Sequence, residues 1–67
     1  MNPGYIVKTK SGKVGRTYHM RGIINKKIAV YLCIKEEQFE GDTFYIEFSE
    51  KAILCAPETL KMIGFID

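Results

Sequence analysis

Few side chains in this sequence have the types and spacing that nucleophilic or metal chemistry requires. They are one histidine, His19, and two cysteines, Cys33 and Cys55. A structural zinc site needs about four ligands at recognisable spacings, and the chain has neither a C-x-x-C nor an H-x-x-x-H motif. A Cys–His nucleophile pair also needs an orienting acid and a substrate cleft, which no sequence feature supplies. We therefore expect no metal, no cofactor, no catalytic residue and no enzyme activity.

Two other motifs have simpler structural interpretations. Glu36 and Glu37 fall in a charged segment that is expected to be solvated, which offers neither the burial nor the close like charge that general acid–base work needs. The segment 12–17 contains two glycines, a lysine and an arginine, but it lacks the GxxxxGK[ST] spacing and no helix follows it. We interpret it as a hairpin turn whose Lys13 and Arg16 can still touch a nucleic-acid backbone.

The size and composition of the chain place its function on its surface. It has 67 residues, of which 46% are hydrophobic and 27% charged, which is typical of a single globular domain spanning residues 1–67. A core built from so short a chain takes almost every aliphatic residue, so no deep site for a small-molecule ligand is expected. The chain lacks an apolar run of about 18 residues and a signal-like N-terminus, which predicts no membrane contact. With two cysteines expected as reduced thiols, the predicted location is the cytoplasm.

Short runs of β-branched and aromatic residues separated by turn residues predict an all-β fold. Gly12 marks a tight turn, Gly15 marks a bulge or bend, Gly41 and Asp42 close a charged connection, and Pro57 begins a single helical turn. Alternation predicts one core face from Ile28, Val30, Leu32 and Ile34 and another from Phe44, Ile46 and Phe48. The expected strands are 5–10, 14–20, 28–34, 43–48, 52–55 and 61–66, with a charged connection at 35–42, a turn at Asn25-Lys26 and a helical turn at 57–60.

Five to six short antiparallel strands with one helical turn before the last strand resemble a small Src-homology-3-like (SH3-like) β-barrel. Within that group the segment 7–32 is loosely similar to KOW-type domains of ribosomal and transcription-elongation proteins. The matching features are Val7, the turn glycine Gly12, Gly15 and the apolar strand segment 30–32. The sequence departs from that pattern at 16–19, where a polar stretch replaces an apolar one. The resemblance implies a module that binds RNA or protein without catalysis.

Charge is distributed unevenly along the chain. Residues 1–35 contain eight basic and no acidic residues, whereas residues 36–67 contain eight acidic residues and two lysines. Either the basic half forms one face that binds RNA or single-stranded DNA, with Tyr18 and Tyr31 available for base stacking, or the two halves pair across strands. The candidate nucleic-acid surface comprises Lys8, Lys10, Lys13, Arg16, Arg21, Lys26 and Lys27.

The favoured function is protein–protein interaction, or self-association, through an exposed sheet face. Alternation turns Ala29, Tyr31 and Cys33 away from the core, and Tyr45 extends the same face on the next strand. Exposed apolar patches of this kind mark partner surfaces. Ile23 and Ile24 lie in a loop, where they either contact a partner or cap one end of the barrel.

Overall fold

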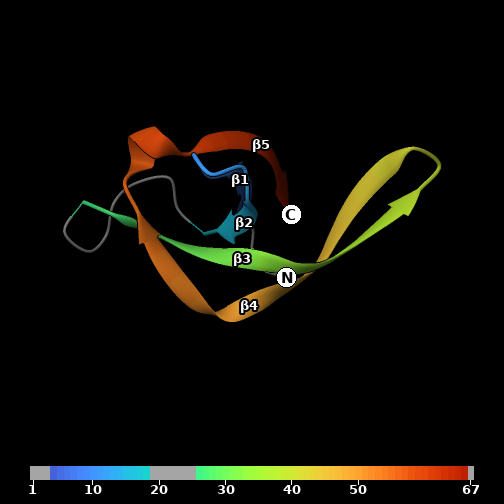
Figure 1. The fold of residues 1–67 in the computed structure, drawn as a ribbon, viewed down its shortest axis with the longest axis horizontal. Coiled ribbons are helices and arrows are strands. Elements are labelled where there is room, and N and C mark those ends of the chain that lie inside the picture. The colour runs from blue at the N-terminus through green and yellow to red at the C-terminus, as the bar shows by residue number, and fades with distance from the viewer. Residues whose placement is uncertain (1–3, 19–25, 67) are drawn as a thin grey trace.

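Five antiparallel strands form one curled sheet in the computed structural model, which describes residues 4–18 and 26–66 (Figure 1). The predicted all-β fold is confirmed, and so are the final strand and the helical turn that precedes it. The strands lie in the order β4-β3-β2-β1-β5. Along the chain the elements are β1 (Gly4–Lys8), β2 (Val14–Thr17), β3 (Ile28–Phe39), β4 (Asp42–Cys55), the 3-10 turn η1 (Pro57–Thr59) and β5 (Lys61–Ile66).

The sheet is not closed. β4 and β5 occupy its two edges, so the predicted closed barrel is not confirmed. η1 carries the chain from one edge strand to the other, with Pro57 at its first position. Its backbone turns because the Leu60 amide donates to the Pro57 carbonyl over 3.1 Å. The described residues contain no apolar helix long enough to cross a bilayer.

The β1–β2 hairpin forms at the glycine that predicted it. Gly12 has φ +87°, a left-handed conformation that glycine adopts without steric cost. The Thr9 amide donates to the Lys13 carbonyl over 2.7 Å, and the Gly12 amide donates to the Thr9 carbonyl over 2.9 Å. The amides of Thr9 and Gly12 are therefore hydrogen-bonded within the turn itself.

Gly15 does not mark a bulge, because β1 and β2 pair without a register shift from Tyr5–Thr17 to Lys8–Val14. It is required instead by the close approach of β2 to β3. A Cβ atom at position 15 would lie 2.5 Å from Val30 Cγ1 and 3.0 Å from the Tyr31 carbonyl oxygen. The side-chain alternation of β2 therefore stays in phase beyond Gly15.

The core is small and lies on the concave face of the sheet. Its centre is Val7, Ile28 and Val30, each at most 1% exposed. Thr17 is also buried there, at 1% exposure. The half-buried side chains that pack around this centre are Tyr5, Leu32, Cys55 and Leu60.

β3 and β4 are longer than predicted and leave the rest of the sheet as a two-stranded ribbon (Figure 1). The expected connection at 35–42 is wrong: β3 continues to Phe39, and a two-residue turn at Glu40-Gly41 leads directly into β4. Both turn residues have positive φ (+52° and +86°), the pattern of a type I′ hairpin turn. The two short strands expected at 43–48 and 52–55 are one continuous strand. We call residues 34–48 the arm and the other described residues the body.

The predicted core face of β3 is correct only in its first half. Ile28 and Val30 are buried and Leu32 is half-buried, but Ile34 is 66% exposed. β2 pairs with β3 only at Tyr31 and Leu32. Ile34 therefore lies beyond the part of β3 that pairs with β2, where β4 is its one neighbouring strand in the sheet.

The predicted inward face of β4 fails for the same reason. Phe44 is 50% exposed, Ile46 is 46% exposed, and Phe48 is half-buried. The register of β3 with β4 also shifts between Tyr31 and Glu36, which interrupts simple alternation.

Some predicted features lie outside the described residues. They are His19, Arg21, Ile23, Ile24 and Asn25. Lys26, the other half of the turn predicted at Asn25-Lys26, is described and has φ +58°.

A first prediction concerns Gly15. Gly15→Ala should lower the free energy of unfolding by about 1–3 kcal/mol, because the new methyl group overpacks Val30 and the β3 backbone. The matched control is Gly64→Ala, whose Cβ would lie in ordinary contact, 3.9 Å from Ile6 Cβ. Urea unfolding of both variants measures the difference, and equal midpoints would contradict the close approach.

Candidate functional site

The structure divides the predicted protein-binding face between the body and the arm. Ala29, Tyr31 and Cys33 lie on the part of β3 that belongs to the body, whereas Tyr45 lies in the arm opposite Glu36. All four side chains are half-buried rather than exposed. The Cys33 thiol donates to the Lys35 carbonyl over 3.2 Å. Both Cys33 and Cys55 are free thiols.

Tyr31 belongs to a small cluster that the sequence did not specify. Its ring meets the ring of Tyr18 edge to face, with centroids 5.7 Å apart and an interplanar angle of 78°. The Arg16 guanidinium carbon lies 4.7 Å from the centre of the Tyr18 ring, which is a cation–π geometry. Cross-strand pairing of Arg16 with Tyr31 holds the cluster together. Tyr18 remains 42% exposed and is the part that a ligand can reach.

The predicted basic residues fall into two groups. Lys8, Lys10 and Lys13 are exposed on β1 and the β1–β2 turn, while Lys26 and Lys27 are exposed just before β3. Arg16 is half-buried in the cluster described above, and Arg21 lies outside the described residues.

Few described residues of opposite charge lie opposite each other across strands, and the pair that does is Lys35 with Glu47 in the arm. Between two residues that the structure describes, one ion pair forms, Lys35–Glu37 at 3.9 Å, and it lies within the arm. β1 and β5 place Lys8 opposite Lys61, which brings like charges together. The β1–β2 hairpin, residues 4–18, carries four basic and no acidic residues, whereas the arm carries five acidic residues and one lysine.

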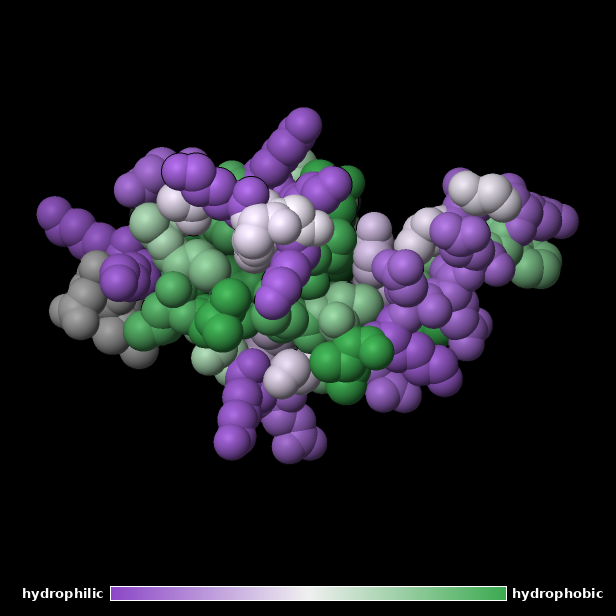
Figure 2. Space-filling view, viewed as in Figure 1, coloured by the Kyte–Doolittle hydropathy of each residue, from purple (hydrophilic) through white to green (hydrophobic). Residues whose placement is uncertain are grey.

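The arm exposes large apolar side chains as well as acids. Ile34 and Phe39 are each 66% exposed, and Phe44 and Ile46 are about half exposed. Figure 2 shows hydrophilic atoms over most of the arm and a hydrophobic region at its tip. Pairing of Glu37 with Phe44 and of Phe39 with Asp42 places these four side chains on one face of the ribbon. That face, which we call the Phe39–Phe44 face, therefore combines two aromatic rings with two carboxylates.

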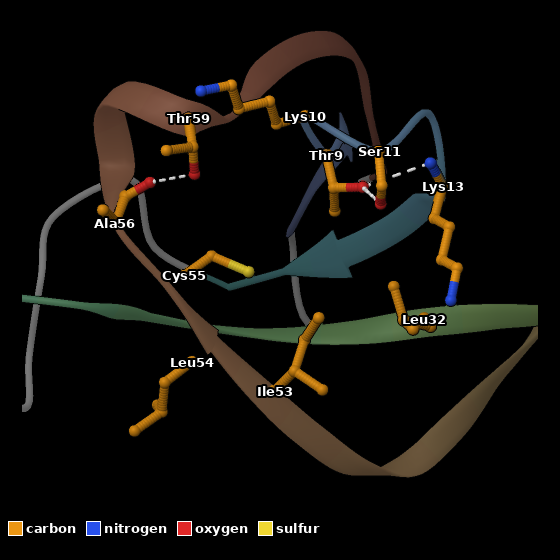
Figure 3. Close-up of a pocket in the computed structure, with 10 residues that line it drawn as sticks. All are labelled: Thr9, Lys10, Ser11, Lys13, Leu32, Ile53, Leu54, Cys55, Ala56 and Thr59. Carbon is orange, nitrogen blue, oxygen red and sulfur yellow. Dashed lines mark hydrogen bonds between the residues drawn. The ribbon is translucent and has the colours of Figure 1, made fainter.

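A groove opens on the body between the β1–β2 turn and the end of β4 (Figure 3). Its volume is about 480 Å³. Apolar side chains of Leu32 and Ile53 and the Cys55 thiol lie along its lower part, and Lys10 and Lys13 extend from the turn above (Figure 3). Lys10 reaches toward Thr59 and Lys13 toward Leu32, so the two ammonium groups stand at different sides of the opening (Figure 3). We call this feature the lysine-rimmed groove.

Glu36 and Glu37 lie exposed on the arm. In residues 4–18 and 26–66 no three His, Cys, Asp or Glu side chains gather in a way that could hold a metal ion. The segment 12–17 is the predicted hairpin turn and the start of β2.

Sequence reasoning missed both the arm and the groove. The arm had one available signal, the Glu40-Gly41 dipeptide between Phe39 and Asp42, which fits a two-residue hairpin turn. The groove had none, because it joins residues from the β1–β2 turn with residues about forty positions later in the chain.

A second prediction separates the arm from the core. Ile34→Ser and Phe39→Ser should each change the free energy of unfolding of the monomer by less than about 0.5 kcal/mol, because these side chains are mostly exposed. Val30→Ala, a smaller truncation of a fully buried side chain, should cost about 2 kcal/mol. Chemical unfolding at low protein concentration measures all three variants. A loss at Ile34 as large as that at Val30 would show that the arm is packed.

Comparison with protein-family models, with curated proteins and with solved structures finds no match for this chain. The function must therefore be inferred from the geometry of the arm, the groove and the Arg16–Tyr18–Tyr31 cluster.

Proposed function

We propose that this protein is a non-enzymatic binding module that engages a protein partner through its arm. The single observation that carries the proposal is the exposure of four large apolar side chains on a ribbon that projects from the body. They are Ile34, Phe39, Phe44 and Ile46. Exposed apolar surface of this kind marks sites of protein association.

Protein–protein interaction is also the function that the sequence favours, but the proposed site is the arm rather than the sheet face of β3. The half-buried residues Ala29, Tyr31 and Cys33 offer a partner less surface than the arm does. Tyr45 lies in the arm and stays within the proposed interface.

For the fold, we propose an SH3-like barrel left open between β4 and β5. The order of the strands and the 3-10 turn before the final strand support this assignment.

A second candidate function is binding of single-stranded nucleic acid. The observation that favours it is the Arg16–Tyr18–Tyr31 cluster. The Arg16 guanidinium belongs to β2, which follows Lys10 and Lys13 in the chain, and the exposed ring of Tyr18 comes directly after β2. Aromatic stacking beside a basic groove is how small barrels hold single strands. The acidic arm opposes this function because it repels phosphates.

Site-specific photo-crosslinking tests the protein-binding function. Benzoylphenylalanine at Phe39 should form a covalent adduct with a protein, whereas the same group at Phe65, on β5 in the body and outside the groove, should give at least about tenfold less. The two variants form a matched pair because both positions are exposed. Mass spectrometry of the adducts in extract of the source cells is the measurement. Absence of any protein adduct at Phe39 would overturn the proposal.

Titration with oligonucleotides tests the second candidate. If single strands bind, ¹⁵N-HSQC shifts should map to Lys8, Lys10, Lys13 and Tyr18 at low salt. They should weaken steeply at about 200 mM salt, because binding releases counterions. Lys13→Glu with Arg16→Glu should abolish the shifts while the remaining spectrum stays folded. Shifts that survive this double change would exclude the basic cluster as the site.

A further inference from the structure

We propose that the partner of the arm is a second copy of this chain, and that the Phe39–Phe44 face of each copy docks in the lysine-rimmed groove of the other. This inference rests on the proposed function and names the partner. The two surfaces differ in charge and shape, so each copy carries both halves of the contact.

Charge complementarity is the first argument. The arm has a net charge of −4, and the β1–β2 hairpin has a net charge of +4. Apart from the exposed Lys35–Glu37 pair, no ion pair joins two described residues, so the exposed lysines of the hairpin, Lys8, Lys10 and Lys13, are available to a partner. Arg16 is not counted among them, because it is engaged in the cluster with Tyr18. Oppositely charged surfaces steer association and set its register.

The chemistry of the two surfaces also matches in detail. The Phe39–Phe44 face presents two aromatic rings next to the carboxylates of Glu37 and Asp42. The groove presents Leu32 and Ile53, with the ammonium group of Lys13 beside Leu32 and that of Lys10 at the other side of the opening, near Thr59 (Figure 3). An aromatic side chain can fill the apolar part while the carboxylates meet the lysines. The groove volume of about 480 Å³ exceeds the volume that one aromatic side chain occupies.

The arm does not occupy the groove of its own chain in this structure. Leu32 and Ile53, which line the groove, belong to the same two strands that continue outward as the arm. The arm points away from the body (Figure 1), so the proposed contact is with another molecule.

Pairing of two arms with each other is disfavoured by charge. It would bring together two ribbons that each carry −4. Reciprocal docking avoids this repulsion and closes a two-fold dimer, in which the same contact occurs twice.

Sedimentation equilibrium of the full chain tests the dimer. The wild type should be dimeric at micromolar concentration. Phe39→Ser with Phe44→Ser should weaken the dimer by at least about 30-fold, because the aromatic anchors are lost. A wild type that stays monomeric up to about 1 mM would overturn the proposal, since that limit is weaker than specific association requires.

Charge reversal then distinguishes reciprocal docking from other dimers. The groove variant Lys10→Glu/Lys13→Glu and the arm variant Glu37→Lys/Asp42→Lys should each dimerise about a hundredfold more weakly than the wild type, because like charges then meet. A mixture of the two variants should form a heterodimer within about tenfold of wild-type affinity, because both contacts regain opposite charges.

The matched control is Lys26→Glu/Lys27→Glu, which makes the same change of net charge outside the groove. It should change the dissociation constant by less than about tenfold. ¹⁵N-HSQC spectra confirm that each variant is folded. A groove variant that dimerises as well as the wild type would show that the arms pair with each other, and a mixture that stays monomeric would equally overturn reciprocal docking.

The crosslink at Phe39 separates failure of this inference from failure of the proposed function. An adduct of twice the chain mass, joined to peptides of the β1–β2 turn or of β4 near Ile53, supports the second copy. If the wild type is monomeric and Phe39 labels a different protein, the arm is a protein-binding site but the partner is not this chain. If Phe39 labels no protein, the proposed function itself fails.

Discussion

The different lengths of the strands govern the rest of this structure. β2 has four residues and pairs with β3 only at Tyr31 and Leu32, whereas β3 and β4 have 12 and 14 residues. Beyond Leu32 the backbone hydrogen bonds of β3 can be satisfied only by β4, so the two strands leave the body as a ribbon. A two-stranded ribbon has no layer packed on either face, and its apolar side chains remain exposed.

The same mismatch separates the charges of the chain. The basic residues lie mainly on the β1–β2 hairpin and ahead of β3, whereas most acidic residues lie on the arm that projects away from them. A monomer built in this way carries an acidic, partly aromatic projection and a basic, partly apolar groove, and this is the basis for assigning a second copy as the partner.

Local chemistry accounts for the predictions that were confirmed. Gly12 and Pro57 act through their own backbone preferences, and the β-branched residues of 28–32 favour a strand wherever it packs. The assignment of faces failed at Ile34, Phe44 and Ile46, because alternation gives the side of a strand but not whether anything covers that side. Gly15 was assigned a bulge because the sequence does not show that β2 passes against Val30.

The sequence by itself determined the class of the fold, most of its turns, the helical turn before the last strand and the uneven distribution of charge, because each depends on neighbouring residues. Only the tertiary structure decided where the sheet remains open, that 34–48 forms an arm, and that Lys10, Lys13, Leu32 and Ile53 line one groove. These features depend on which strands pair and for how long. Such pairing is set by contacts between residues far apart in the chain, which no local pattern encodes.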